Sequence, residues 1–377
     1  MREVLPDGRW VLHTAPRLGG LTDRWIDLQA RSGERYESRL LGGEVADGVG
    51  RRPHWLVAQD RLDMRIAYRW MYASRGLSVS LAATALRRTH PTVVHSHYGE
   101  LAAQHRLFAR ALDAPLVASF YGYDATKAVY RTERRWRRLY ARLFAEGAAV
   151  MVEGPAMSAR VESLGCPTDK LRVVRMPADA EALAGVRRPK ADHFRVVAPG
   201  RFIEKKGFDV AIKAFARAFR GVKDARLILL GGGELEPMLR ELAISEGIDG
   251  QTDWAERLPF ADFMGEISMA HVGLYPSRTA SSGDSEGGAP VTLIEAQWLG
   301  VPAIVSDHDD LPFVAAPGGA LVVPPLDVDL WAESLRTLYD EPAKLEGMAG
   351  RAADFAQQNH APHLNLVARE AVYDEVS

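Results

Sequence analysis

Short apolar runs alternate with segments of helical period along most of the chain. The runs are rich in valine, leucine and isoleucine, and glycine or proline follows several of them. This alternation is typical of βαβ units stacked on parallel sheets. The clearest expected strands are WVLHTA (10–15), VVHSHYG (93–99), LVASF (116–120), FRVVAPGR (194–201), RLILL (226–230) and AIVS (303–306).

The length of the chain favours two domains. With 377 residues it is too long for one ordinary hydrophobic core. A polar, alanine-rich connector, ADAEALAGVRRPKADH, follows Met176 and Pro177. We therefore expect one α/β domain before this connector and a second one after it.

The stretch SSGDSEGGAPVTLIEAQWLGVPAIVS (281–306) carries the strongest chemical signal. A glycine-bearing polar loop ends at Pro290, where a helical period begins and continues to Gly300. Backbone N–H groups at such a helix start suit an anion. Glu286 in the loop and Glu295 in the helix can accept hydrogen bonds from hydroxyl groups. The stretch therefore predicts a phosphorylated, hydroxyl-rich ligand such as a nucleotide sugar.

Two cations follow the expected strand at 194–201. Arg201 ends this strand, and Lys206 precedes Gly207 and a helical period at 208–219. Arginine can form paired hydrogen bonds to phosphate oxygens, and lysine adds a point charge, so the two suit a diphosphate. Lys205 beside them is expected to be solvated.

Composition narrows the class of protein. The formal net charge of −2 argues against a dedicated nucleic-acid binder. The single cysteine, Cys166, excludes an intrachain disulfide and a zinc site made of thiolates. The N-terminus has no apolar signal-peptide core, and no run approaches the roughly 18 apolar residues of a spanning helix. We expect a cytoplasmic protein, which could still touch the inner face of a membrane.

Three further stretches, APGRFIEKKGFDVAI, ARLILLGGGELEPML and VVHSHYGELAAQH, join 281–306 in a familiar order and spacing. Together they resemble the family-four retaining glycosyltransferases of the GT-B fold. SFYGYDATK and GCPTDKLRVVRM most resemble members that assemble exopolysaccharides. The resemblance implies two Rossmann-like domains facing a central cleft, with the C-terminal helix crossing back to the first. The N-terminal acceptor domain would span 1–180 together with the final helix, 361–377, and the nucleotide-sugar domain 181–360.

The resemblance also implies a reaction and its residues. A hexosyl group would pass from a nucleotide-diphosphate sugar to a hydroxyl with retained configuration, without a metal or other cofactor. Arg201 and Lys206 would stabilise the leaving diphosphate. Glu286 would hold the donor sugar and Glu295 the ribose, and the leaving phosphate could take the acceptor proton. The other donor-binding residues expected are Gly19, Gly20, Gly200, Arg257, Leu258, Gly287, Gly288, Ala289, Pro290 and Val291.

Three positions depart from the family pattern. Tyr121 stands where the family has a histidine that touches the donor sugar, so a hydroxyl contact could survive but imidazole chemistry could not. Eight residues, instead of seven, separate Glu286 from Glu295, and Phe313 replaces the usual glutamate. An extra residue in a helix would turn each later side chain by about 100°, whereas loops absorb one at small cost. We therefore predict a bulge at 287–289, with Glu295 in register and Glu286 and the Tyr121 hydroxyl facing the cleft.

The acceptor side is expected at strand ends of the first domain. His97 and Asp124 follow two expected strands. His95 and His97 form a pair that could suggest a metal, but no third ligand stands nearby in the sequence, so cleft wall or hydrogen-bonded core is favoured. The acidic run 307–310 is likewise interpreted as a cap or turn instead of a metal site.

The segment RTERRWRRLYARLF (131–144) predicts a helix with arginines, including Arg134 and Arg138, largely on one face. Such a face could simply be solvated. It could also contact a sugar or lipid-linked glycan acceptor, or an anionic membrane surface.

Two rival functions remain open at this stage. A non-catalytic nucleotide-sugar-binding partner subunit with this fold would tolerate Tyr121 and the longer glutamate spacing. A same-fold enzyme could instead epimerise or hydrolyse the nucleotide sugar. Product analysis separates these from transfer.

Overall fold

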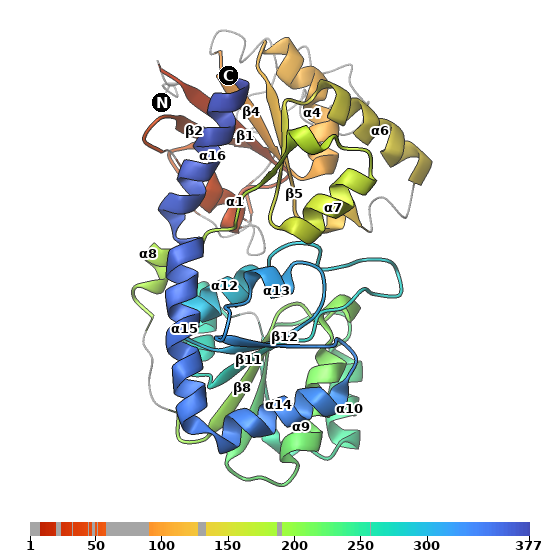
Figure 1. Ribbon diagram of the computed structural model, residues 1–377, viewed down its shortest axis with the longest axis vertical. Helices are drawn as coiled ribbons and strands as arrows, with labels where there is room; N and C mark the ends of the chain where they lie inside the picture. The colour runs from red at the N-terminus through yellow and green to blue at the C-terminus, as the bar shows by residue number, and fades with distance from the viewer. Residues whose placement is uncertain are drawn as a thin grey trace. The chain divides into compact units, whose positions relative to one another are not determined.

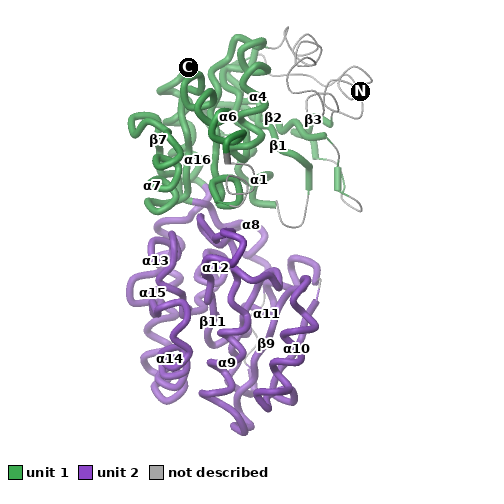
Figure 2. Tube along the Cα trace, turned by 90° about the vertical axis from the view of Figure 1, so that its right-hand side faces the viewer, with its two compact units in different colours: residues 1–175, 363–377 green, residues 176–362 purple. Residues whose placement is uncertain are grey.

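The computed structural model describes residues 8–19, 24–31, 33–43, 45–46, 50, 52–57, 90–126, 133–186, 191–256 and 258–377. The chain divides into two compact units (Figure 2). Unit 1 comprises Met1–Arg175 and His363–Ser377, and unit 2 comprises Met176–Pro362.

In the described part of unit 1, seven strands form one sheet in the order β3-β2-β1-β4-β5-β6-β7. Each adjacent pair is parallel. The strands are β1 (Trp10–Ala15), β2 (Glu37–Gly42), β3 (Trp55–Val57), β4 (Val93–His97), β5 (Leu116–Phe120), β6 (Ala149–Val152) and β7 (Leu171–Val173). The helices are α1 (Arg24–Gln29), α4 (Gly99–Ala111), α6 (Glu133–Glu146), α7 (Pro155–Ser163) and α16 (Pro362–Val376).

The period-two alternation of strands divides unit 1 into two apolar layers. Leu12 and Val94 pack on one face with residues of α4, α6 and α7. Val11 and Val93 point to the other face, where they pack with Tyr373 of α16. Figure 1 shows α4, α6 and α7 on one side of the sheet and α16 on the other. The last helix of the chain is therefore part of the first unit.

The described part of unit 2 contains a six-stranded parallel sheet in the order β10-β9-β8-β11-β12-β13. Its strands are β8 (Phe194–Pro199), β9 (Ala225–Leu230), β10 (Thr252–Ala255), β11 (Val272–Tyr275), β12 (Ala303–Ser306) and β13 (Ala320–Val323). Its helices are α8 (Ala180–Leu183), α9 (Phe208–Phe219), α10 (Glu236–Ser245), α11 (Phe260–Ser268), α12 (Val291–Trp298), α13 (Leu311–Val314), α14 (Val328–Asp340) and α15 (Pro342–His360). Apolar side chains of α9 and α14 pack with the strands in its core.

The expected fold class is confirmed, because both units carry parallel sheets with helices and the final helix joins unit 1. Some strands were not expected from the sequence, among them β2 and β3. β2 begins with three polar residues, Glu37, Ser38 and Arg39, and β3 has only three residues. None of the described helices combines the length and the apolar character needed to cross a bilayer.

Candidate functional site

The carboxyl ends of the strands are where each sheet can hold a ligand. The order of the strands reverses between β1 and β4 in unit 1 and between β8 and β11 in unit 2. Ligands of open α/β sheets bind beyond the carboxyl ends of the strands at such points. Most of the residues predicted for the site lie in the loops that follow these strands.

In unit 2, the loops after β8 and β9 meet through their backbones. Gly200 has φ 145° and Gly231 has φ 142°, a region that residues with a Cβ avoid. A Cβ on Gly231 would lie 1.9 Å from the carbonyl oxygen of Gly200. Only glycine fits there, and the close approach fixes the start of the loop that carries Arg201.

Lys206 and Glu286 form an ion pair across two loops of unit 2. Lys206 Nζ lies 2.5 Å from Glu286 Oε1, although the two residues are 80 positions apart in the sequence. Ser277 Oγ donates to Glu286 Oε2 at 3.5 Å. The side chains of Lys206 and Glu286 are only 16% and 10% exposed, so solvent screens this pair weakly. Two of the four residues predicted to be catalytic are thus in direct contact.

The surrounding charge determines the protonation of Glu286. Burial alone would raise the pKa of its carboxyl. The positive charges of Lys206, Lys205 and Arg201 outweigh burial and lower the pKa below its ordinary value. Glu286 is therefore ionised at neutral pH and acts as a hydrogen-bond acceptor. Arg201 contributes to this field while its own side chain is exposed to solvent.

Lys205 does not lie in solvent, and that expectation was wrong. Its side chain is 8% exposed. Lys205 Nζ donates to Asp284 Oδ1 at 3.1 Å and to the carbonyl oxygen of Ser285 at 2.9 Å. Because both partners belong to the loop that carries Glu286, this second lysine holds the loop against the turn of Lys206.

The acidic run after β12 supports the same loop. The Gly287 N–H donates to Asp309 Oδ2 at 3.0 Å, and the Ser285 hydroxyl also contacts this carboxylate. His308 Nε2 lies 2.9 Å from Ser285 Oγ. Among the described residues, no group of potential metal ligands includes a residue of 307–310. These contacts of the run are with the glutamate loop, and its interpretation as a turn without a metal stays a prediction.

The glutamate loop leads into α12 as a tight turn. Gly287 has φ 69°, and the Gly288 N–H donates to the Glu286 carbonyl oxygen at 2.7 Å. Pro290 caps α12, which begins at Val291. Glu295 lies in α12 with 4% of its surface exposed, close enough to Tyr275 to raise the pKa of that phenol together with burial. Its contact with a ribose stays a prediction, as does the bulge at 287–289.

Only some of the remaining residues predicted to bind the donor lie in the described part of the chain. Leu258 is partly exposed just beyond β10, and Gly19 follows β1 with φ 73°. Gly20 and Arg257 lie outside the described residues.

In unit 1, Tyr121 follows β5 and is partly exposed. Its hydroxyl points inward, where it lies 2.6 Å from His97 Nδ1. The ring packs edge-on against Trp25, with ring centroids 4.2 Å apart. The prediction that this hydroxyl faces the cleft stays a prediction.

Asp124 forms the interior of the loop that carries Tyr121. The residue is fully buried. Its carboxylate accepts hydrogen bonds from the backbone N–H groups of Gly99 at 2.7 Å, and of Tyr121 and Gly122 at 3.0 Å each. These contacts give Asp124 a structural part in shaping the loop, which the sequence did not reveal.

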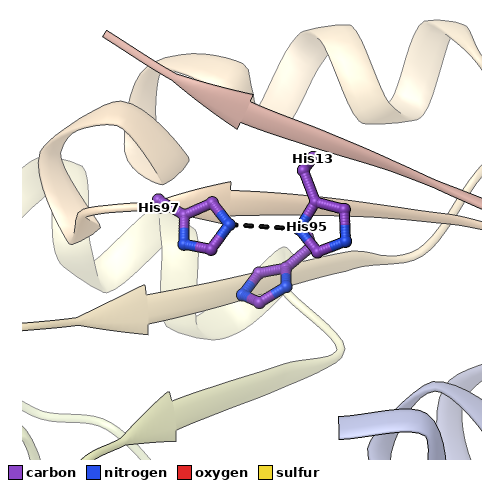
Figure 3. A group of neighbouring side chains, drawn as sticks. All are labelled: His13, His95 and His97. Atoms are coloured by element: carbon purple, nitrogen blue, oxygen red, sulfur yellow. Dashed lines mark hydrogen bonds between the residues drawn. The ribbon is translucent and has the colours of Figure 1, made fainter. Parts of the chain in front are cut away.

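A third histidine completes the pair seen in the sequence. His13 of β1 lies beside His95 and His97 of β4 (Figure 3), and their candidate ligand atoms fall within 4.8 Å of one another. The assumption that no third ligand stands nearby was therefore wrong, because β1 and β4 are adjacent in the sheet although distant in the chain. Burial, and then the charge of Arg369, lower the pKa of His97 to about 3.

The arginines of α6 lie on the surface of unit 1. Arg134 and Arg138 are exposed, as are Arg135, Arg137 and Arg142. Trp136 and Leu139 of the same helix pack against the core. The helix therefore presents a dense positive surface next to its buried face.

Comparisons with known proteins cover both units. A model of the family "Glycosyl transferases group 1" matches residues 181–355, and a model of "Glycosyltransferase Family 4" matches residues 36–182. The chain is 27% identical over 221 residues to the amylovoran biosynthesis glycosyltransferase AmsK of Erwinia amylovora, covering 58% of this chain and 54% of that protein. It is 30% identical over 199 residues to the putative colanic acid biosynthesis glycosyltransferase WcaL of Escherichia coli, covering 52% and 48%.

The chain thus spans about half the length of the curated relatives it matches. Its fold resembles that of Anabaena Alr3699/HepE, solved in complex with UDP-glucose. The TM-score is 0.75 at 15% identity, with 97% of this chain and 99% of that chain covered. Two glycosyltransferase family models together extend from residue 36 to 355, each matching less than half of the chain, and the two parallel-sheet units have a fold of the GT-B type.

Proposed function

We propose that the protein is a retaining glycosyltransferase that moves a hexosyl group from a nucleotide-diphosphate sugar to a hydroxyl of a glycan acceptor. The observation that carries this proposal is the Lys206–Glu286 pair beside Arg201, at the carboxyl edge of the unit 2 sheet. The diphosphate and the sugar are adjacent in the donor. The ion pair likewise places Lys206, which suits the diphosphate, beside Glu286, which suits the sugar.

The charges fit departure of a nucleoside diphosphate. Negative charge builds up on the diphosphate as the bond to the sugar breaks, and fixed cations stabilise that charge. Arg201 can donate paired hydrogen bonds to phosphate oxygens, and Lys206 supplies a point charge. With two cations in this role, a divalent metal is not required, and the leaving phosphate can take the acceptor proton.

Glu286 serves the sugar in this scheme. Its lowered pKa keeps the carboxylate ionised, so it accepts hydrogen bonds from sugar hydroxyls. Two such bonds fix the sugar ring relative to the breaking bond. Because Lys205 and Asp309 anchor the loop on either side, the carboxylate can orient the sugar with little entropic cost at the moment of reaction.

The class of donor and acceptor is supported by the similar proteins. One solved neighbour holds UDP-glucose, and two relatives are named for the biosynthesis of amylovoran and of colanic acid. We therefore propose exopolysaccharide or related glycan assembly as the setting. The arginine surface of α6 would meet an anionic lipid-linked acceptor or membrane headgroups.

Product analysis after incubation with a panel of nucleotide sugars and glycan acceptors tests the proposal. A thermal-shift screen selects the donor first, since a ligand at 100 times its dissociation constant stabilises by about 2.7 kcal/mol. Transfer releases nucleoside diphosphate together with a glycosylated acceptor of retained anomeric configuration, which NMR of the product reports. Binding without any product would support the partner-subunit alternative, and an altered or freed sugar would support epimerisation or hydrolysis.

A further inference from the structure

One carboxylate binds the residues on both sides of Glu286. The Ser285 hydroxyl donates to Asp309 Oδ2, and the Gly287 N–H donates to the same oxygen at 3.0 Å. The glutamate loop follows β11 and Asp309 follows β12, and these two strands are paired in the sheet of unit 2. Their carboxyl ends are therefore side by side, which brings Asp309 to the backbone of the glutamate loop.

His308 adds a second partner for Ser285. Its Nε2 lies 2.9 Å from Ser285 Oγ and 3.1 Å from Asp309 Oδ2. The single proton of the Ser285 hydroxyl goes to the carboxylate, so its oxygen accepts from His308 and His308 Nε2 carries a proton. Ser285 is fully buried and the side chain of Asp309 is 10% exposed, so water competes weakly for these hydrogen bonds.

Lys205 holds the same loop from another direction. Its Nζ donates to the carbonyl oxygen of Ser285 at 2.9 Å, so Ser285 is bound through both its carbonyl and its hydroxyl. Gly287, on the other side of Glu286, is bound through its N–H to Asp309. The backbone that carries the Glu286 side chain is thus fixed before and after this residue.

A donor would change some contacts of Glu286 and leave others. The Lys206–Glu286 pair uses the cation that we propose for the diphosphate and the carboxylate that we propose for the sugar. A donor that binds both groups therefore replaces this pair. The contacts of Asp309 with the loop use neither the Lys206 ammonium nor the Glu286 carboxylate. They hold the loop both before and after the donor binds.

The backbone at Asp309 indicates that its carboxylate matters. Asp309 has φ 46°, in the left-handed region that residues with a Cβ rarely adopt. Glycine adopts this region without steric cost. Residues held in such conformations occur most often at functional sites, where the surrounding structure fixes them. Since glycine would suit the backbone at least as well, the hydrogen bonds of the carboxylate account for an aspartate here.

We propose that Asp309 is a positioning residue that acts through Glu286. By holding Ser285 and Gly287, it keeps the Glu286 carboxylate directed at the donor sugar once the diphosphate has taken Lys206. This inference rests on the proposed function, because the contact of Glu286 with the sugar is part of that function.

Two variants of Asp309 separate the carboxylate from the backbone. Asp309→Gly and Asp309→Ala both remove the carboxylate, but only glycine relieves the left-handed conformation. Both should lower kcat about 10- to 100-fold, the effect of a small displacement of a positioned group. Their affinity for the nucleoside diphosphate selected by the thermal-shift screen should stay close to that of the wild type. Asp309→Gly should have a higher Tm than Asp309→Ala, so equal losses of kcat would not follow stability.

Asp309→Asn is the conservative variant. Asparagine also tolerates the left-handed region, and its Oδ1 can still accept a hydrogen bond from Ser285 or Gly287. This variant should therefore recover part of the kcat that Asp309→Gly loses.

Two controls match the changes at Asp309. Asp113→Gly relieves the same kind of conformation, φ 55°, in unit 1. Asp327→Ala removes another carboxylate of unit 2 that binds a backbone N–H, that of Leu330 at 3.0 Å. Either control can change Tm, and both should leave kcat unchanged.

A double-mutant cycle tests whether Asp309 acts through Glu286. In a Glu286→Ala background, Asp309→Gly should lower kcat no further, since the group that it positions is gone. Ser285→Ala removes one of the two hydrogen bonds without changing the backbone of Asp309, and it should lower kcat several-fold. If the Asp309 variants fail to fold, Ser285→Ala carries the same cycle.

Crystal structures with the nucleoside diphosphate show the positioning without turnover. In the wild type, Glu286 should keep its direction when the diphosphate pairs with Lys206, and in Asp309→Gly it should turn away. A kcat that follows Tm across the variants, equal losses with and without Glu286, or an unmoved Glu286 in Asp309→Gly would overturn the proposal. Nucleotide binding without any transfer would instead contradict the proposed function, and the two crystal structures would still decide the role of Asp309.

Discussion

The carboxyl edges of the two sheets have the same architecture, but the side chains at one edge are charged and those at the other are neutral. In unit 2, Lys206 and Glu286 form a partly accessible ion pair next to the exposed Arg201. In unit 1, His97 and Tyr121 form part of a neutral, mostly buried hydrogen-bond network. Each edge follows strands of a parallel sheet at the point where strand order reverses.

The difference shows how the surrounding charge determines protonation. Burial would neutralise Glu286, yet the adjacent cations keep it ionised. Burial also disfavours charge on His97, and the Arg369 cation strengthens that effect. The charged side chains of the unit 2 edge can pair with a charged ligand, so this edge suits a diphosphate. The neutral side chains of the unit 1 edge are held by hydrogen bonds, so this edge suits a ligand that it recognises by shape.

The largest effect should follow from removing the charges of unit 2. Arg201→Ala combined with Lys206→Ala should lower kcat/KM about 100-fold or more, since each charge-assisted hydrogen bond contributes roughly 1.5–3 kcal/mol. Steady-state kinetics and calorimetric titration of the nucleoside diphosphate measure the loss. Lys223→Ala, an exposed lysine of the same unit, is the matched control. Wild-type affinity and rate in the double variant would remove the diphosphate site from these residues.

A smaller effect is expected from the arginine surface of unit 1. Arg134→Glu with Arg138→Glu should reduce binding to anionic vesicles and lower turnover on lipid-linked acceptors several-fold, because each basic residue near such a surface contributes about 1 kcal/mol. Donor affinity should not change. Arg110→Glu on α4 is a control with the same charge change at another exposed site. If vesicle binding and turnover were both unaffected, the arginine surface would contact only solvent, and its proposed contact with an acceptor or membrane would be wrong.

The neutral edge predicts a pH effect on stability. The pKa of His97 is about 3 in the folded protein and has an ordinary value of 6.5. Between these values only the unfolded chain binds the proton, so His97 makes stability fall as pH drops from 6.5 towards 3. The slope for one proton is about 1.4 kcal/mol per pH unit. Urea denaturation across this window should therefore show a less steep fall in His97→Gln, and equal slopes would contradict a neutral His97.

The smallest expected effect is that of a chelator. With Arg201 and Lys206 carrying the charge of the diphosphate, transfer should continue in EDTA at an unchanged rate. The assay compares untreated protein with protein dialysed against chelator, with and without added magnesium or manganese. Complete loss that either metal restores would contradict the cationic site and would also reopen the three histidines as a metal centre.

Much of the fold could be predicted from local pattern. Buried parallel strands appear in the sequence as apolar runs, and the glycines of the loops at Gly200 and Gly287 indicate turns. For this reason β8, α9, α12 and β12 lie where the sequence indicated. β2 and β3 could not be found this way, since a short or partly polar strand owes its position to its neighbours.

The contacts between distant segments were beyond local pattern. His13 joins His95 and His97 only because β1 and β4 pair in the sheet. Lys205 and Lys206 are adjacent in the sequence, and only the folded loop shows that the first is buried on Asp284 while the second faces Glu286. The contact of Tyr373 with His95 likewise depends on α16 returning to unit 1.

The most direct test of the proposed function compares transfer and nucleotide binding in Glu286→Ala. If Glu286 orients the donor sugar while Arg201 and Lys206 hold the diphosphate, transfer should fall at least about 100-fold and affinity for the nucleoside diphosphate should remain within a few-fold of the wild type. Glu204→Ala is the control. Its carboxylate accepts a hydrogen bond from Ser281 and takes no part in the Lys206–Glu286 pair, so this variant should retain activity. Unchanged transfer in Glu286→Ala would contradict the account.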